Sequence, residues 1–258
     1  MGIIGGPIGY WLLKAIYPGG QGVAMGSDDP YAARGLSKLK TLFGAGVYDE
    51  LRDKVVLDFG CGTGDNAIEL AKNGCRRVIG LDIQERLLVQ ARKSAEAAGV
   101  ADRCIFTTDW KEPVDVILTM DAFEHFDDPA GILSIMRGLL KESGYVLIEF
   151  GPTWYHPRGG HLFAVFPWAH LIFTERALIR WRTDFKTDGA KRFGEVAGGL
   201  NQMTIHKWED LVAGSDLRFL SYEQVPIRRI KPLHSRLTRE FFTAIVRARL
   251  TPKVAQSL

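Results

Sequence analysis

Short apolar runs alternate with stretches of helical periodicity between residues 54 and 150 of the chain. Short runs of apolar residues between turn signals predict buried strands, whereas apolar residues that recur every three or four positions predict amphipathic helices. A regular alternation of the two is typical of βαβ units, and it predicts an α/β fold with a doubly wound parallel sheet. The expected strands cover residues 55–59, 77–81, 104–107, 114–120 and 145–150, the last after a turn at Ser143-Gly144.

Three helices are expected between these strands, because each carries a start or end signal. They span residues 66–72 behind Asp65 as N-cap, 85–98 ahead of Gly99, and 129–141 behind Asp128 as N-cap.

The alternation stops after residue 150. Residues 151–203 are rich in Trp, Phe, His and Gly and show no clean period, so they are interpreted as one large insertion. Regular patterns then resume, with a helix expected over 206–213, a strand over 217–225, a helix over 238–242 and a strand over 244–250.

Composition adds few constraints. The hydrophobic fraction of 46%, the charged fraction of 24% and the net charge of +3 are ordinary for a globular protein. From Arg218 onward, however, nine Lys/Arg face two acidic residues. The ordinary explanation is a solvated basic face. The alternatives are that these residues bind an anionic ligand, a membrane surface or a partner subunit.

The N-terminal segment 2–17 is apolar but contains several glycines and Lys14. It lacks a basic leader and a cleavage site, so a lid is favoured over a shallow membrane contact, and no signal peptide is expected. Three cysteines are too few for a disulfide framework, which fits a reducing cytoplasm.

A glycine-rich segment, Asp58-Phe59-Gly60-Cys61-Gly62-Thr63-Gly64, follows the first expected strand. Glycines at such a turn let the backbone approach a ligand closely. A dinucleotide fingerprint would need its third glycine at position 65, where the chain has Asp65. A carboxylate there would repel a pyrophosphate, so a dinucleotide is disfavoured, whereas a cationic ligand tolerates both Asp58 and Asp65.

Acidic residues also end the next two expected strands. Asp82 can accept both hydrogen bonds from a ribose diol, although a plain helix cap is its alternative role. Asp109 can accept from an exocyclic amino group, and Trp110 beside it can cover an aromatic ring. Three carboxylates at successive strand ends, after the glycine loop, together predict a nucleoside-like ligand.

These motifs resemble those of the class I S-adenosylmethionine (SAM)-dependent methyltransferases. Residues 58–64 resemble motif I, Asp82 motif II and Asp109 motif III, while 114–118 and 120–126 resemble the element after strand four of small-molecule enzymes such as those of ubiquinone biosynthesis. The resemblance implies a Rossmann-like seven-stranded sheet with a terminal antiparallel hairpin, a cap insertion after strand five, and SAM as cofactor. It also implies these cofactor-binding residues: Asp58, Gly60, Cys61, Gly62, Gly64, Asp82, Ile83, Asp109, Trp110 and Met120.

The chain is accordingly divided into four parts by sequence. Residues 1–45 are expected to form N-terminal lid or cap helices, 46–150 the SAM-binding core, 151–203 an acceptor-binding insertion, and 204–258 the C-terminal part of the core sheet.

Four of the six histidines, at positions 125, 156, 161 and 170, fall where the acceptor is expected, at the carboxyl ends of the strands. His156, His125 and His161 are the candidate catalytic residues, since a hydroxyl acceptor needs a general base. Hydrogen-bonded pocket structure is their alternative role. A metal held by His156, His161 and an acid is a further alternative, but no compact ligand motif is present and no metal is expected.

The sequence therefore predicts a cytoplasmic SAM-dependent methyltransferase that acts on a small molecule, with a hydroxyl of a metabolite, a lipid-linked or a glycan-type acceptor favoured. C- or N-methylation, RNA or protein methylation, a dinucleotide oxidoreductase and a non-catalytic SAM-binding protein are the alternatives. No nucleic-acid partner is expected, a peripheral membrane contact is left open, and the oligomeric state is not determined.

Overall fold

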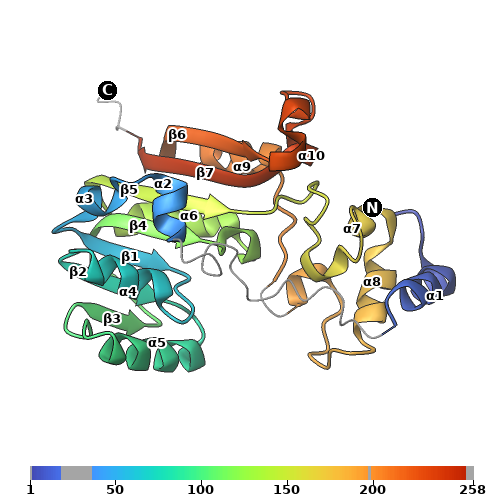
Figure 1. Cartoon of the computed structure of the whole chain (residues 1–258), viewed down its shortest axis with the longest axis horizontal. Helices are drawn as coiled ribbons and strands as arrows, with labels where there is room; N and C mark the ends of the chain where they lie inside the picture. The colour runs from blue at the N-terminus through green and yellow to red at the C-terminus, as the bar shows by residue number, and fades with distance from the viewer. Residues whose placement is uncertain (1, 19–36, 197–198, 254–258) are drawn as a thin grey trace.

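A single seven-stranded sheet forms the centre of the computed structural model, which describes residues 2–18, 37–196 and 199–253 (Figure 1). The strand order is β3-β2-β1-β4-β5-β7-β6. β1 to β5 are parallel, and β7 runs antiparallel to both β5 and β6, so the predicted doubly wound sheet with a terminal antiparallel hairpin is confirmed. The strands are β1 (Val55–Phe59), β2 (Arg77–Leu81), β3 (Cys104–Thr107), β4 (Val114–Met120), β5 (Leu140–Phe150), β6 (Leu217–Pro226) and β7 (Thr243–Pro252).

The sheet reverses its winding direction at β1, which lies between β2 and β4. Asp58 of β1 stands opposite Gly80 of β2 and Leu118 of β4, so the loop after β1 opens between the ends of both neighbours. In open α/β sheets, ligands bind in the crevice at such a switch point, beyond the carboxyl ends of the strands.

Helices cover both faces of the sheet and create two apolar cores. One face is covered by α2 (Lys38–Phe43), α3 (Val47–Leu51), α4 (Asp65–Lys72) and α5 (Glu85–Ala97). α6 (Pro129–Leu139) and α9 (Ile205–Gly214) cover the other. Side-chain oxygens cap the starts of α2, α6 and α9, which satisfies backbone donors that would otherwise lack a partner.

Several boundaries differ from the sequence prediction, and two of these differences change the role of a residue. α4 begins at Asp65, so the residue before the helix is Gly64 in the left-handed conformation, and Asp65 is not the N-cap. The turn predicted at Ser143-Gly144 lies inside β5, which begins at Leu140. Leu140 pairs with Val114 of β4 and Tyr145 pairs with Val116, so residues 141–144 form a bulge between these two pairs. Such a bulge admits turn-forming residues without ending the strand.

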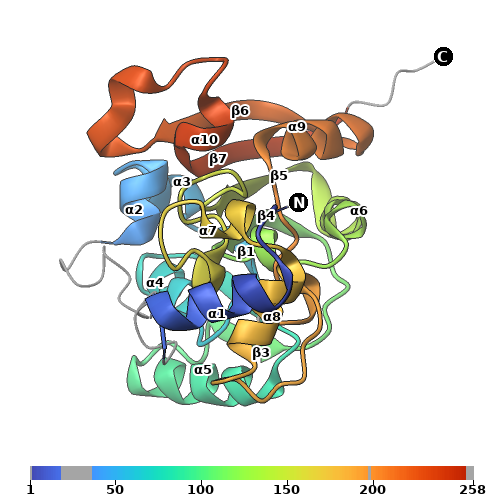
Figure 2. The same cartoon turned by 90° about the vertical axis from the view of Figure 1, so that its right-hand side faces the viewer.

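The insertion builds a third apolar core of its own, and the N-terminal helix belongs to it. α1 (Gly6–Ile16) packs on α8 (Glu175–Arg182), and the Tyr10 hydroxyl donates to Asp184 at 2.9 Å. The insertion also contains η4 (His161–Phe163), α7 (Ala169–Ile172) and η5 (Phe193–Glu195). Figures 1 and 2 show this group beside the sheet, at the end of the molecule toward which the parallel strands point. Residues 1 and 19–36 of the predicted lid lie outside the described residues.

Three short elements complete the described part of the chain: η3 (Phe123–His125) after β4, and η6 (Arg228–Leu233) and α10 (Arg239–Phe242) between β6 and β7. All three cysteines are free thiols. Over residues 2–18, 37–196 and 199–253, no helix combines the length and the apolar character that crossing a membrane requires.

Candidate functional site

The glycine-rich loop is tied to the end of β2 by backbone hydrogen bonds. The amides of Gly60 and Cys61 both donate to the carbonyl of Leu81, at 2.8 and 3.1 Å. The Gly62 amide donates to Oδ2 of Asp82 at 2.9 Å. The loop after β1 and the carboxylate after β2 are therefore one structural unit, as a ligand that spans both strands requires.

Gly62 and Gly64 both adopt left-handed backbone angles, with φ of 53° and 82°, but their surroundings differ. A Cβ at Gly64 would lie 2.7 Å from the ring of Phe106 and 2.9 Å from Cβ of Ala91. A Cβ at Gly62 would meet no atom within 4 Å. Gly64 thus serves the packing of the loop on α5 and β3, while Gly62 faces open space.

Two alanine substitutions separate these roles. Gly64→Ala should lower the free energy of unfolding by about 2–4 kcal/mol. The cost of an alanine in the left-handed conformation and the cost of the clash with Phe106 and Ala91 add together. Gly62→Ala should lower it by only about 1 kcal/mol, and should weaken binding of S-adenosylhomocysteine at least about tenfold. Urea unfolding and calorimetric titration measure the two quantities. Equal destabilisation by both changes, or full affinity in Gly62→Ala, would contradict this assignment.

Asp58 lies inside β1 and is buried. The Ala67 amide donates to its carboxyl group, whose Oδ2 has no partner. Burial, together with the charges of Asp65 and Asp82, raises the pKa of Asp58 to about 7. The other carboxylates lie around a buried oxygen of Asp58 that has no hydrogen-bond partner. This arrangement suits a cationic ligand, because a positive charge there would stabilise the ionised form of Asp58. The ammonium and sulfonium groups of SAM fit these residues.

The remaining predicted cofactor residues lie along the same edge of the sheet. Asp82 Oδ1 accepts from the Gln84 amide at 2.8 Å, and Ile83 between them is exposed. Asp109 is exposed and its carboxylate lies 3.1 Å from Nζ of Lys111. Trp110 packs partly on the core and its Nε1 donates to the Glu112 carbonyl, while Met120 is buried at the end of β4. Among the described residues, no hydrogen bond or ion pair joins Asp109 to Asp82, so their common role stays a prediction.

A group of charged residues that the sequence interpretation missed lies beside the end of β4. The ammonium of Lys38, at the start of α2, pairs with Asp121 and lies 3.3 Å from Glu149 of β5. Burial raises the pKa of Glu149, with Asp121 adding to the shift and Lys38 opposing it. A charged residue inside the expected strand 145–150 was the sequence signal for Glu149, whereas Lys38 carries no such signal.

Glu124 is a second buried carboxyl at this end of the sheet. The Gly151 amide donates to its Oε1 at 3.3 Å, and its Oε2 has no partner. Burial raises the pKa of Glu124 from 4.5 to about 8, and Asp121 contributes to the increase. The side chain is thus a neutral acid in the folded chain at neutral pH, although a carboxylate when the chain is unfolded.

Glu124→Gln should stabilise the cofactor-free protein, and more so at alkaline pH. A pKa that is higher in the folded state means stability is lost as pH rises through about 8. A glutamine side chain does not ionise, so the variant does not lose this stability as the pH rises. The melting-temperature difference between variant and wild type should therefore grow by about 3–6 °C between slightly acidic and alkaline buffers. Thermal melts of both proteins across this range measure it, and a constant difference would show that Glu124 titrates normally.

The three predicted catalytic histidines are in different hydrogen-bonding states. Nδ1 of His125 lies 3.0 Å from the Gly199 carbonyl, which only accepts, so this nitrogen carries the proton and Nε2 keeps its lone pair. Nδ1 of His156 accepts from the Arg158 amide at 3.0 Å, so neutral His156 carries its proton on Nε2. Burial lowers the pKa of His156 to about 4.

His161 from the insertion lies against His125 from the core, with ring centroids 5.1 Å apart. Its Nε2 is buried and has no hydrogen-bond partner. Burial is the main cause that lowers the pKa of His161 to about 4, and the charge of the neighbouring His125 contributes to the decrease. The structure thus brings His125 and His161 together, while no hydrogen bond or ring contact among the described residues joins His156 to either. His170 is buried, and its Nε2 donates to the Trp154 carbonyl at 2.7 Å.

Glu124, His125 and His161 also form a group whose ligand atoms all lie within 4.8 Å of one another. Two imidazoles and one carboxylate are a donor set that suits several divalent metals. The sequence interpretation considered His156 in place of His125 and expected no metal. The hydrogen bond from Nδ1 to Gly199 leaves Nε2 of His125 as the nitrogen available to an ion.

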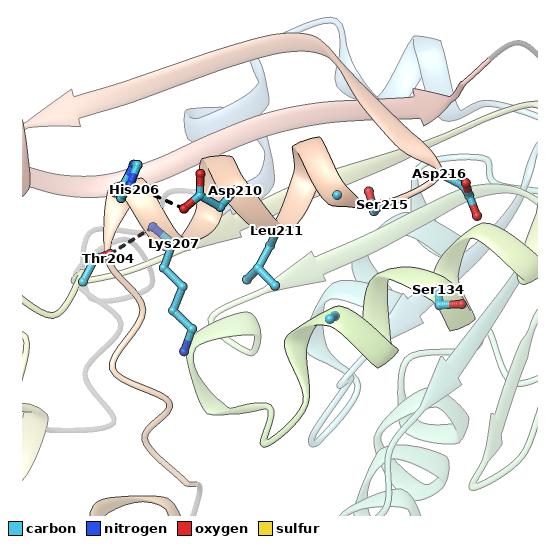
Figure 3. A pocket seen from close by; sticks show the side chains of 10 residues that line it. Ser134, Thr204, His206, Lys207, Asp210, Leu211, Ser215 and Asp216 are labelled. Carbon is cyan, nitrogen blue, oxygen red and sulfur yellow. Dashed lines mark hydrogen bonds and ion pairs between the residues drawn. The ribbon is translucent and has the colours of Figure 1, made fainter.

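A separate hollow of about 550 Å³ lies between α6 and α9 (Figure 3). Ser134 contributes to its wall from α6, and Lys207, Asp210 and Leu211 contribute from α9. None of its lining residues belongs to the glycine loop or to the predicted catalytic group. The hollow lies on a helical face of the sheet and is not the cofactor site.

Comparison with known proteins identifies the family. The sequence model of a family described as a methyltransferase domain matches residues 31–213. The ubiquinone biosynthesis O-methyltransferase of Neisseria meningitidis serogroup C (strain 053442) is 39% identical over 107 residues, which are 39% of this chain and 45% of that protein. The ribosomal protein L11 methyltransferase of Haemophilus influenzae (strain PittEE) is 44% identical over 94 residues, 36% of this chain and 28% of that protein. The chain thus spans less than half the length of these curated relatives.

Solved structures share the fold at low sequence identity. The PH0226 protein from Pyrococcus horikoshii OT3 matches with a TM-score of 0.53 and 17% identity, over 94% of this chain and 99% of that one. The [4+2]-cyclase SpnF matches with a TM-score of 0.53 and 13% identity, over 81% and 80%. At such identities the likeness shows the fold alone, and one fold carries different chemistries.

Because the family model covers most of the chain, this protein belongs to the methyltransferase-domain family. Its class is that of the class I SAM-dependent methyltransferases, with SAM as cofactor, and the prediction made from the glycine loop and the strand-end carboxylates is confirmed.

Proposed function

We propose that this chain transfers the methyl group of SAM to a hydroxyl group of a small-molecule acceptor, with His125 as the general base. The observation that carries the proposal is the hydrogen bond from Nδ1 of His125 to the Gly199 carbonyl. It fixes the tautomer, so that Nε2 keeps a lone pair, and it orients the ring. A hydroxyl acceptor needs such a base, whereas a carbon nucleophile that is already acidic does not.

The residues around His125 support the same chemistry. His161 is held neutral by burial, so it adds no positive charge that would oppose proton uptake by its neighbour. Buried apolar groups of the insertion, such as Phe163 and Trp154, exclude water from this end of the molecule. SAM, when bound at the glycine loop, supplies an electrophilic methyl group, and the chain's own task is to orient the acceptor and remove its proton.

The four parts predicted from sequence take on these roles in the proposal. Residues 46–150 hold the cofactor, 151–203 bind the acceptor, 1–45 contribute α1 to the insertion and α2 to the core, and 204–258 complete the sheet. Similarity to a ubiquinone biosynthesis O-methyltransferase supports a hydroxyl acceptor, and similarity to ribosomal protein L11 methyltransferases keeps protein methylation as the alternative.

Methyl-labelled SAM offered with different acceptors tests the proposal. Phenolic and alcoholic metabolites, their lipid-linked and glycan-type counterparts, ribosomal protein L11 and RNA should each be incubated with the full chain. We expect label in the ether of a small hydroxyl compound. Label confined to protein or RNA, or to a carbon or nitrogen atom, would overturn the proposed acceptor. Equal turnover of an acceptor with and without its lipid would contradict the lipid-linked class.

A further inference from the structure

The connection between β6 and β7, residues 227–242, forms a basic and apolar projection beside the insertion (Figures 1 and 2). Its exposed cations make no ion pair among the described residues, and none of the six residues of η6 is buried. Leu233 lies between Lys231 and Arg236 in the sequence, and Leu237 follows Arg236; the two leucines are 57% and 93% exposed. The exposed cations are Arg228, Arg229, Lys231 and Arg236.

Contacts at its base hold this connection in place. The guanidinium of Arg239 makes two hydrogen bonds to Glu209, of 2.5 and 2.6 Å. The ring of Phe241 lies 5.4 Å from that of Tyr155 in the insertion. The only acid of the segment, Glu240, is engaged by the first two amides of α9, at 2.9 and 2.8 Å. The four cations therefore stay in solvent with no acid of their own segment free to compensate them.

A second exposed apolar surface lies on α1, which is also packed on the insertion. Tyr10 and Leu13 face α8 and are buried. The opposite side of α1 carries large apolar side chains at helical spacing, between 42% and 71% exposed: Ile8, Trp11, Leu12 and Ile16. A helix that is apolar on both faces, one of them in solvent, is typical of a contact with a partner or a membrane.

We propose that the 227–242 connection and the exposed face of α1 dock this protein on an anionic lipid bilayer. Four uncompensated cations complement anionic headgroups, and exposed leucine, isoleucine and tryptophan side chains partition into the interfacial region. A nucleic acid would satisfy the cations but not the aliphatic side chains, so a lipid surface accounts for both features. Both elements contact the insertion, so docking brings that end of the molecule to the bilayer. The inference concerns binding only and does not depend on the proposed methyl transfer.

Vesicle co-sedimentation of the full chain tests this inference. We expect the wild type to bind phosphatidylcholine vesicles that contain phosphatidylglycerol, more weakly at high salt, and to bind pure phosphatidylcholine poorly. The combined change Arg228→Gln, Arg229→Gln, Lys231→Gln and Arg236→Gln should weaken binding to the anionic vesicles at least about 30-fold. A matched control removes four exposed cations elsewhere, by Lys72→Gln, Arg76→Gln, Arg77→Gln and Lys93→Gln, and should bind like the wild type.

Two apolar variants complete the test. Leu233→Gln with Leu237→Gln, and Ile8→Gln with Trp11→Gln, should each weaken vesicle binding at least about fivefold, with unchanged melting temperatures. The control variant losing as much affinity as the quadruple variant would overturn the inference. So would no vesicle binding by the wild type, or tight binding of an RNA oligonucleotide that the arginine changes abolish and the leucine changes leave intact.

Discussion

Asp82→Ala should weaken the binding of S-adenosylhomocysteine by about 100-fold to 1000-fold. The carboxylate holds the glycine loop through the Gly62 amide, at 2.9 Å, and is the predicted acceptor for the ribose diol. Two charge-assisted hydrogen bonds contribute about 3–5 kcal/mol together, and the loop loses its attachment to β2 as well. Calorimetric titration of wild type and variant with S-adenosylhomocysteine measures the change.

Asp82→Asn separates the two contributions, because the amide oxygen still accepts from Gly62 but one acceptor is lost. We expect a decrease in affinity of about 10-fold to 30-fold for this variant. Asp102→Ala, an exposed change in the turn after α5, is the control and should bind as the wild type does. Wild-type affinity in Asp82→Ala would remove this carboxylate from the cofactor site.

His125→Asn should lower kcat by about 100-fold to 1000-fold, the usual contribution of a general base. Asparagine keeps an N–H group that can donate to Gly199, but it has no counterpart of Nε2. Binding of S-adenosylhomocysteine should stay unchanged, because His125 is not among the predicted cofactor residues. Initial rates with the acceptor that the labelling experiment identifies measure kcat, and calorimetric titration measures the affinity for S-adenosylhomocysteine.

Three further experiments test whether the loss of kcat is due to a general base at His125. His206→Asn changes an exposed histidine that lies near Asp210 on α9, and it should leave kcat unchanged. His156→Asn tests the other histidine predicted from sequence, and a larger loss of kcat there than at His125 would move the base to His156. Loss of wild-type activity on chelation, with recovery on addition of a divalent cation, would instead make Glu124, His125 and His161 metal ligands.

Much of the cofactor half was predictable because its signals are local. A strand followed by glycines, as at 55–64, specifies a tight turn, and the parallel arrangement then brings the ends of β1, β2 and β3 to one edge. Asp58 stands out in the sequence because a charged residue in a buried strand needs a partner. Glu149 carries the same signal in β5, but its partner Lys38 lies more than 100 positions away, so the sequence does not show how the charge is compensated.

The proposed acceptor site was not predictable in the same way, because its contacts join residues far apart in the chain. His125 and His161 meet across 36 positions, and Lys38 reaches Asp121 and Glu149 from the start of α2. The roles of His125 and His156 depend on which ring nitrogen faces a carbonyl or an amide, and composition and spacing carry no such information. The packing of α1 on α8, with the opposite face exposed, likewise depends on a contact between segments about 165 residues apart.

The sequence by itself determined the α/β class, the order of the strands and the glycine loop, since these follow from periodicity and from turn chemistry within a few residues. Its resemblance to the class I methyltransferases implied the cofactor. Only the tertiary structure decided which carboxyls are buried and neutral, which histidine has an available lone pair, and where cations and apolar side chains gather on the surface. The reason is physical: burial, tautomer and charge compensation are set by neighbours in space, which long-range packing brings together and which the order of residues along the chain does not specify.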